Sequence, residues 1–184
     1  MIGFMPEIYP DELLYSMFAR YYERSGYMAY IFAAEDLFQN KNERPDVEFI
    51  NRLTQDAQSV IHKKMSEDEV IMNHTMFPYY GRFLGKERRT EAYFALLNTD
   101  GNYRNLLPIP KAKRQRFLRY CPMCVNMDRD KYGETYWHRI HQMQSVDICP
   151  IHFCVLQNTD IAIGSTTSPR FSAAENMIKD FEKI

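Results

Sequence analysis

All four cysteines of this chain fall within one stretch near its carboxy-terminal end, and this clustering limits how the chain can fold. Cys121-Pro-Met-Cys124 and Cys149-Pro-Ile-His152 share a two-residue spacing, and in both a proline follows the first member. This spacing lets both members of a pair reach one ion from a single tight turn. The two pairs together supply the four sulfur and nitrogen ligands that a tetrahedral zinc ion prefers. We therefore predict one structural zinc ion, bound by Cys121, Cys124, Cys149 and His152.

Other interpretations of these cysteines are weaker. A lone Cys-x-x-Cys is also a redox motif, and cytosolic cysteines are often small, buried apolar residues. Cys154 could replace His152 as the fourth ligand, but its spacing from Cys149 does not repeat that of the first pair. We treat Cys154 as a buried thiol. A catalytic zinc keeps an open position beside three protein ligands, so four apparent ligands favour a structural role.

Size and composition indicate a globular protein. The 184 residues suit one domain, or one domain with a small satellite, and 45% of them are hydrophobic. The net charge of −1 shows no chain-wide basic excess of the kind that accompanies nucleic-acid or anionic-membrane binding. The longest apolar run, residues 27–34, is far shorter than the roughly 20 residues that cross a bilayer. We expect a soluble, cytoplasmic protein with no membrane partner, in a compartment that keeps cysteines reduced.

Apolar residues recur at helical spacing through the amino-terminal part of the chain. Ser25-Gly26 provides a stop signal, and Ser66 with Glu69 forms a capping box. The expected helices cover residues 11–25, 28–38, 47–61 and 86–97, with a short one after Ser66. The lengths of those between residues 11 and 63 are compatible with a helix-turn-helix.

The segment 98–110 marks the expected subdomain boundary, because Asp100-Gly101 and Pro108-Ile109-Pro110 cannot continue a helix. We predict a mainly α protein of the α+β type, with short strands at the zinc-binding pairs. Ser172 and Glu175 are expected to cap a last helix. The predicted divisions are a helical domain over 1–103, a zinc-finger or zinc-ribbon module with a preceding basic strip over 104–164, and a linker with a carboxy-terminal helix over 165–184.

A basic strip precedes the first cysteine pair. Residues 104–119 contain six basic and no acidic side chains, which makes the strip the candidate phosphate-binding surface. The alternative is a solvated connector that keeps the boundary soluble. The predicted DNA-binding residues are Lys111, Lys113, Arg114, Arg116 and Arg119.

The stretch between the two pairs carries Glu134, His138 and His141 close to Trp137. Its aromatic residues suggest a helix face packed on the zinc site. The two histidines could form a second metal site, or an acid–base pair with Glu134. Histidines in such a position beside a tryptophan are more often hydrogen-bonded structural residues, so we assign them no catalytic role.

Several motifs of the chain form a recognisable set. They are Arg119-Tyr120-Cys121-Pro122-x-Cys124, Asp128-x-x-x-Tyr132-Gly133-Glu134-x-Tyr136-Trp137-His138-Arg139-x-His141-Gln142, Cys149-Pro150-x-His152, Pro10-Asp11-Glu12-Leu13-Leu14-Tyr15-Ser16 and Phe77-Pro78-Tyr79. In these motifs the chain resembles the TniQ/TnsD family of transposon target-selection proteins. The resemblance implies a helical amino-terminal domain and a zinc-binding domain. It also implies a role in choosing an insertion site and recruiting the transposon's AAA+ ATPase. Metal ligation carries over to the four residues already reached from spacing.

Two local departures from the family pattern concern turns. The family commonly has Leu-Pro-Gly after His-Gln, where this chain has Met143-Gln144-Ser145, and glycine after the ligand histidine, where it has Phe153. TnsD-like proteins also usually continue with further DNA-binding modules, for which residues 157–184 leave little room. The four expected zinc ligands are unchanged.

From these features we predict a non-enzymatic adaptor in DNA transposition, with zinc as its structural cofactor and no small-molecule substrate. Its expected partners are the transposon AAA+ ATPase and, weakly, duplex DNA. Aromatic residues are favoured at interfaces, so Tyr79 and Tyr80 are the candidate partner-binding residues. The alternatives are a zinc-supported DNA nuclease, which would use Glu134, His138 and His141, and a general zinc-containing protein-interaction module.

Overall fold

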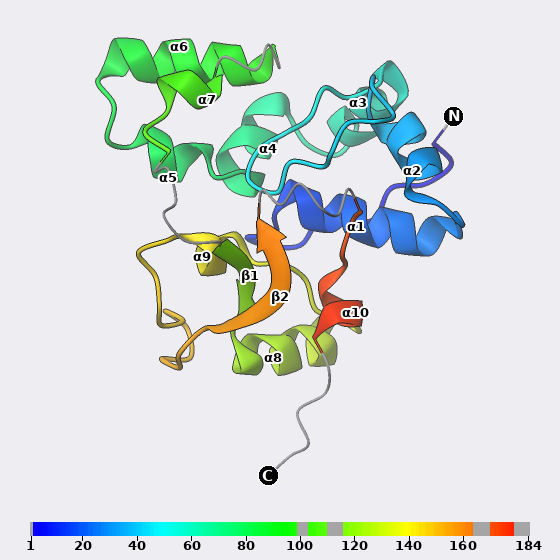
Figure 1. Ribbon diagram of the computed structural model, residues 1–184, viewed down its shortest axis with the longest axis vertical. Helices are drawn as coiled ribbons and strands as arrows, with labels where there is room; N and C mark the ends of the chain where they lie inside the picture. The colour runs from blue at the N-terminus through cyan, green and yellow to red at the C-terminus, as the bar shows by residue number, and fades with distance from the viewer. Residues whose placement is uncertain (1, 99–102, 110–115, 164–169, 179–184) are drawn as a thin grey trace.

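The computed structural model describes residues 2–98, 103–109, 116–163 and 170–178. The helices and strands in these ranges are α1 (Leu14–Ser25), α2 (Tyr30–Leu37), α3 (Gln55–His62), α4 (Glu67–His74), α5 (Phe77–Gly81), α6 (Lys86–Leu97), α7 (Tyr103–Leu106), β1 (Arg116–Tyr120), α8 (Pro122–Tyr132), α9 (Arg139–Gln142), β2 (Gln157–Ile163) and α10 (Ala174–Met177). Helices α1 to α7 form the upper part of the molecule in Figure 1, and the two strands with α8 and α10 form the lower part.

The sheet consists of β1 and β2 in an antiparallel pair. Arg116 lies opposite Ile163 at one end of the pair, and Tyr120 lies opposite Gln157 at the other. Mostly helical structure with a small two-stranded sheet beside the cysteines confirms the predicted fold class. Within the described ranges, no helix is both long and apolar enough to cross a membrane.

Helix α1 contributes the most continuous buried segment, since every residue from Leu14 to Tyr21 is buried. It ends at Gly26, whose φ of 70° lies in the left-handed region that glycine adopts without a steric cost. The helix begins at Leu14 rather than at the expected Asp11. Asp11 itself has a φ of 56°, and the N–H of Leu13 donates to the carbonyl of Trp137 at 3.0 Å. Pairing with a distant segment therefore replaces the first expected turn.

The helix expected over residues 47–61 is shorter in the structure, because α3 begins at Gln55. Asp46 Oδ1 accepts hydrogen bonds from the backbone N–H groups two and three residues later, at 3.0 and 3.1 Å. Asn51 Oδ1 accepts from the N–H of Asp46 at 2.7 Å. Such side-chain bonds offer the backbone an alternative to the helix. Thr54 then caps α3 with its side chain.

The segment expected to be helical around Trp137 is instead extended before the short helix α9. His138 and Glu12 form an isolated antiparallel bridge. Leu13 donates to the Trp137 carbonyl, and the Trp137 N–H donates to Ser16 Oγ at 3.0 Å. Trp137 is fully buried. Backbone pairing with the start of α1 therefore overrides the local helical pattern.

The last helix, α10, forms without the expected capping box. Its N-cap is Ala173, which makes no side-chain capping bond. Glu175 accepts hydrogen bonds from Arg129 Nε at 3.0 Å and from the N–H of Thr135 at 2.9 Å. Glu175, which was expected to cap the helix, instead links α10 to α8 and to the segment after α8. The expected linker at 164–169 lies outside the described residues.

One hydrophobic cluster joins elements from across the chain. Leu14 of α1, Phe77 of α5, Leu118 of β1, Trp137 and Phe171 all belong to it. The cysteines and Leu156 form a smaller cluster of their own. The division of the chain at residues 103 and 164 stays a prediction.

A network of buried charged side chains surrounds Arg20 of α1. Arg20 donates to both carboxylate oxygens of Glu12, at 2.9 and 2.7 Å, and to Glu134 Oε1 at 2.9 Å. The Arg20 guanidinium also lies 4.1 Å from the centre of the Tyr9 ring. The side chains of Arg20 and Glu12 are 2% and 0% exposed, so water cannot replace either partner. The network connects α1 to the chain just before Trp137.

Replacing Arg20 with methionine should lower the free energy of unfolding by about 3–5 kcal/mol, because Glu12 would be left buried and unpaired. Urea denaturation at neutral pH measures the change. The matched control is Lys41→Met, which removes an exposed ion pair with Glu35 and should cost roughly 1 kcal/mol or less. Equal effects of the two substitutions would contradict the importance of the buried network.

Candidate metal centre

Strand β1 delivers the first pair of cysteines to the start of α8. Cys121 follows the strand directly and is the N-cap residue of α8. Pro122 occupies the first helical position, where a missing N–H costs nothing. Cys124 lies in the first turn, and its N–H donates to Cys121 Sγ at 3.4 Å. Both sulfur atoms are therefore held on the same side of one tight turn.

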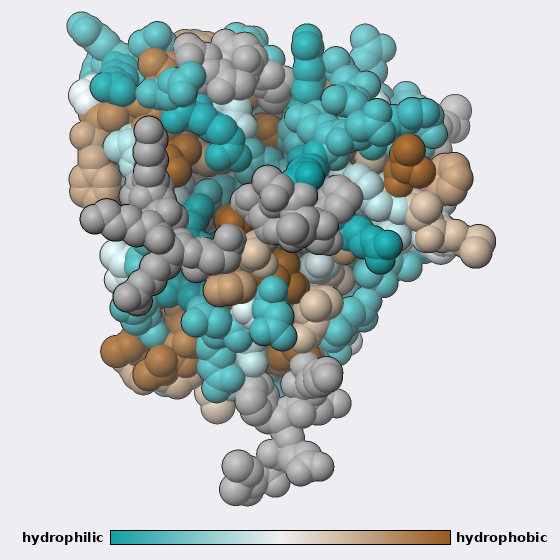
Figure 2. All heavy atoms as spheres, viewed as in Figure 1, coloured by the Kyte–Doolittle hydropathy of each residue, from teal (hydrophilic) through white to brown (hydrophobic). Residues whose placement is uncertain are grey.

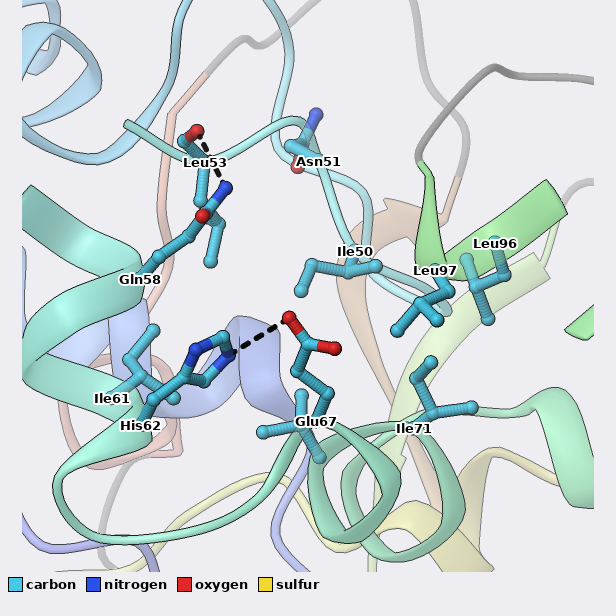
Figure 3. Close-up of a pocket in the computed structure, with 11 residues that line it drawn as sticks. Ile50, Asn51, Leu53, Gln58, Ile61, His62, Glu67, Ile71, Leu96 and Leu97 are labelled. Carbon is cyan, nitrogen blue, oxygen red and sulfur yellow. Dashed lines mark hydrogen bonds and ion pairs between the residues drawn. The ribbon is translucent and has the colours of Figure 1, made fainter. Parts of the chain in front are cut away.

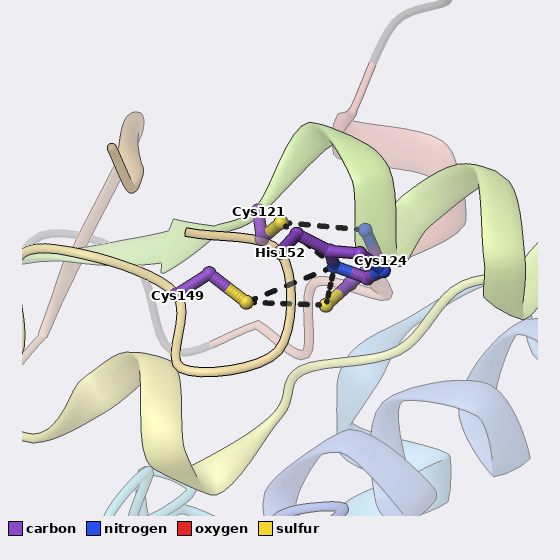
Figure 4. Close-up of side chains that lie close together, drawn as sticks. All are labelled: Cys121, Cys124, Cys149 and His152. Carbon is purple, nitrogen blue, oxygen red and sulfur yellow. Dashed lines mark hydrogen bonds between the residues drawn. The ribbon is translucent and has the colours of Figure 1, made fainter. Parts of the chain in front are cut away.

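The second pair lies on a reversal of the chain before β2. The N–H of Cys149 donates to the carbonyl of Cys154 at 2.8 Å, and the N–H of Phe153 donates back to the carbonyl of Cys149 at 2.9 Å. These two bonds close the turn that contains His152. The turn directs Cys149 and His152 toward Cys121 and Cys124 (Figure 4).

The four side chains lie close enough together to hold one metal ion. Their ligand atoms all lie within 4.8 Å of one another. His152 Nδ1 lies 3.5 Å from Cys121 Sγ and 3.2 Å from Cys124 Sγ, and Cys124 Sγ lies 3.7 Å from Cys149 Sγ. Zinc with its usual bond lengths requires edges of about 3.5–3.8 Å. The donor set and its spacing therefore fit zinc, and all four coordination positions would be taken by the protein.

The protonation of the thiols bears on how an ion would bind. Burial raises the pKa of Cys121 to about 12 and also raises that of Cys124. For Cys149, burial acts in the same direction, but hydrogen bonds from the backbone N–H groups of His152 and Ile151 bring its pKa below the usual value. Because zinc binds thiolates, the ion must displace protons from Cys121 and Cys124.

Glu134, His138 and His141 do not form one group of potential metal ligands. Glu134 accepts hydrogen bonds from Tyr9 and Arg20, on the side facing α1. His138 Nε2 lies 2.8 Å from an oxygen of Asp128, whereas His141 Nε2 faces the cysteine cluster. In the part of the chain that the structure describes, the cysteine–histidine group is the only cluster of three or more potential ligands.

A family of known proteins matches most of this chain. The TniQ family model matches residues 4–156, which is most of the sequence. The chain belongs to the TniQ family. The matched region contains both pairs of potential metal ligands and all of the helices before them.

One curated relative of this TniQ protein is the transposition protein TnsD of transposon Tn7, from Escherichia coli. The two sequences are 29% identical over 152 residues. The matched region covers 80% of this chain and 30% of the relative. The TniQ chain therefore spans less than a third of the length of that relative.

Cys154 lies close to the metal-binding group but outside it. Its sulfur is 3.2 Å from Cys121 Sγ, whereas the group of four mutually close ligand atoms includes His152 instead. Cys154 is half-buried, so the expected buried thiol is partly exposed. The choice of His152 over Cys154 as the fourth ligand stays a prediction, and this geometry supports it.

The described part of the basic strip is engaged within the protein. Arg116 donates to both carboxylate oxygens of Glu48 at 2.9 Å, and its side chain is 22% exposed. Arg119 pairs with Asp147 at 3.2 Å and donates to the carbonyl of Met143. These two guanidinium groups contact other parts of the protein. The run of basic residues in the sequence did not predict these contacts. Lys111, Lys113 and Arg114 lie outside the described residues, and DNA binding by the strip stays a prediction.

The two tyrosines expected at a partner surface differ in exposure. Tyr80 is 2% exposed and donates its hydroxyl to Glu48 at 2.7 Å, so it belongs to the core rather than to an exposed docking surface. Tyr79 is half-buried, and its hydroxyl lies 3.2 Å from Ser145 Oγ. The aromatic pattern did not reveal that Tyr80 is drawn inward, because Glu48 comes from a distant loop.

The structure also contains a small hollow between α3, α4 and α6 (Figure 3). Apolar residues such as Ile61 and Leu96 line it, and His62 faces Glu67 at 3.8 Å. Its volume of about 50 Å³ is well below the roughly 150 Å³ of a cavity that binds benzene. The hollow is too small for a drug-sized ligand, and we assign it no function.

A more prominent feature, which motif analysis missed, is an apolar surface on the second metal-binding turn. We name it the knuckle patch, and its exposed members are Ile148, Ile151, Phe153 and Val155. In Figure 2, apolar residues gather at the lower left, over this part of the chain. The sequence contains four large apolar side chains within the eight residues 148–155, but only the structure shows that none of them is buried. Clustered exposed apolar side chains commonly mark interaction sites.

Chelation or loss of a ligand should test the metal site directly. We expect one zinc ion per chain by elemental analysis, and its loss in Cys121→Ser. Zinc binding in small modules contributes on the order of 10–16 kcal/mol at pH 7, so residues 121–156 should lose protection from hydrogen exchange while α1 retains more. The matched control is Cys154→Ser, which should keep its zinc. A folded, metal-free wild-type protein would rule out the site.

Phe153 has a φ of 54°, the left-handed conformation that residues with a side chain avoid. Its side chain is 81% exposed, so packing does little to offset this strain. Phe153→Gly should raise the free energy of unfolding by about 1 kcal/mol, because the relieved strain of about 1–2 kcal/mol exceeds the added chain entropy. Phe153→Ala keeps the Cβ atom and should bring no such gain. Thermal or urea unfolding of the zinc-loaded proteins distinguishes the two.

Proposed function

We propose that this chain is a non-enzymatic transposition protein that engages target DNA or a targeting complex and recruits the AAA+ ATPase of its transposon. The observation that carries the proposal is the TniQ family match over residues 4–156. The relative TnsD is named as a transposition protein of Tn7, which supports the same process for this chain. Zinc would serve as a structural cofactor.

The form of the metal site supports an adaptor rather than an enzyme. Four protein ligands would complete the coordination of zinc and leave no open position for a substrate or an activated water. The residues proposed for a nuclease also have separate partners, since Glu134 binds Arg20 and His138 binds Asp128, and among the described residues they form no cluster of potential metal ligands. Adaptors need accessible surface and not catalytic groups.

The knuckle patch is the surface that we propose for the ATPase. Its apolar side chains are held out by a turn that the metal ion would stabilise. Phe153 in particular combines high exposure with a strained backbone. Strain of this kind persists where the surroundings enforce it, and it is concentrated at functional sites. The patch thus replaces Tyr80 as the candidate docking surface.

DNA contact is proposed as a secondary contribution. Arg116 and Arg119 already have carboxylate partners, so the proposal depends on Lys111, Lys113 and Arg114 for phosphate contacts. Phosphate contacts from a few point charges imply binding in the non-specific range of roughly 10⁻⁴–10⁻⁶ M at physiological salt.

Mixing the purified chain with its cognate ATPase, ATP and duplex DNA should give a complex in size-exclusion chromatography. Ile151→Glu combined with Val155→Glu should abolish the complex, because charges within an apolar interface are costly to desolvate. Zinc content and helicity of this variant should remain unchanged.

The matched control is Met28→Glu combined with Phe32→Glu. These two side chains are also exposed and apolar, but they belong to the region around α2. This variant should still form the complex. If no complex forms under any nucleotide condition, and the chain cleaves DNA with added magnesium or manganese, the nuclease alternative replaces the adaptor proposal.

A further inference from the structure

A zinc ion bound by these four ligands would leave the site negatively charged. Three thiolates and one neutral imidazole around Zn²⁺ carry a net charge of −1. Cys121, Cys124 and Cys149 are all buried, at 1% exposure or less, so water cannot solvate this charge. A buried anionic group requires hydrogen-bond donors from the protein. Each thiolate should therefore have a donor of its own.

Two of the three thiolates obtain donors from the backbone. The N–H of Cys124 lies 3.4 Å from Cys121 Sγ. The N–H groups of Ile151 and His152 donate to Cys149. These donors follow from the tight turns themselves, because a Cys-x-x turn directs its backbone N–H groups at the first sulfur.

The third sulfur, that of Cys124, has a side-chain donor within reach. His141 Nε2 lies 3.7 Å from Cys124 Sγ, in the range of a hydrogen bond to sulfur. The other polar neighbours of this sulfur, Cys149 and His152, are proposed ligands of the same ion. Within the described residues, His141 is thus the one side chain outside the ligand set that faces Cys124 Sγ.

The surroundings of His141 determine which nitrogen carries its proton. His141 is 1% exposed, and its Nδ1 has no hydrogen-bond partner among the described residues. A buried N–H without an acceptor is rarer and more costly than a buried acceptor without a donor. The proton therefore belongs on Nε2, the nitrogen that faces the sulfur.

A neighbouring hydrogen-bonded pair holds the His141 ring in place. The rings of His138 and His141 have centroids 4.8 Å apart. His138 is fixed in turn by Asp128, 2.8 Å from its Nε2, and Asp128 also accepts a hydrogen bond from Thr135 Oγ1. This arrangement limits the rotation of His141 without supplying it with a competing partner.

We propose that His141 is a positioning residue of the metal centre, which donates its Nε2–H to the Cys124 thiolate when zinc is bound. The inference rests on zinc binding by the four ligands but not on the role of the chain in transposition. It gives a chemical function to a histidine that the motif suggested as a second metal ligand or a catalytic base.

The test compares His141→Phe, which keeps a planar ring without the donor, with His141→Gln, which keeps an N–H donor. Zinc affinity is measured by competition with a chelator on the full chain. Loss of a hydrogen bond behind a ligand typically weakens metal binding 10–100-fold, so we expect that loss for the Phe variant and a smaller one for the Gln variant. The second readout is the sulfur-to-metal charge-transfer band of the Co²⁺-substituted protein. The band should move to lower energy in the Phe variant, because a Cys124 thiolate without a hydrogen-bond donor is easier to oxidise.

Three results would overturn the inference. The Phe variant could match the wild type in zinc affinity and in its Co²⁺ spectrum. The Gln and Phe variants could lose affinity equally with an unchanged band, which would indicate packing and not donation. If the Phe variant fails to fold, His141→Ala takes its place, and an unshifted Co²⁺ band in that variant would be the third such result. Absence of zinc from the wild type is a separate outcome, which refutes the metal site itself.

Discussion

The segment from Glu134 to Gln142 connects the helical part of the molecule to the metal centre, and both depend on it. Trp137 exchanges hydrogen bonds with Leu13 and Ser16 at the start of α1, and its ring is fully buried. Buried backbone groups must find partners, so neither the start of α1 nor this segment can be satisfied without the other. The packing of α1 and the placement of α9 beside the cysteines therefore depend on each other.

Charged side chains on both sides of this connection form hydrogen bonds across it. Asp11 adopts a left-handed conformation, and its carboxylate accepts hydrogen bonds from Arg139 Nε and from the N–H of Ile140. Arg20 links Glu12 to Glu134 on the other side of the same junction. These contacts are specific in direction and distance, whereas apolar packing alone tolerates sliding. They determine the register in which the two parts of the chain meet.

The metal-binding turns combine a rigid interior with an exposed apolar exterior. The sulfur atoms are enclosed, while Ile151, Phe153 and Val155 extend outward from the same turn. A glycine would suit the backbone conformation of Phe153 better, so a residue with a side chain at this position lowers the stability of the fold. Natural proteins retain such costs where the side chain has a use, which connects the strained turn to the proposed docking surface.

The sequence by itself indicated the pairing of residues in the cysteine–histidine cluster, the capping box at Ser66 and most helices, because these depend on spacings of three or four residues. Only the tertiary structure decided that Asp46 begins an irregular loop and that Tyr80 and Arg116 converge on Glu48. These outcomes depend on partners from distant parts of the chain, about which a local pattern carries no information. The carboxylate partners of Arg116 and Arg119 and the position of His141 beside Cys124 were likewise decided by neighbours in space.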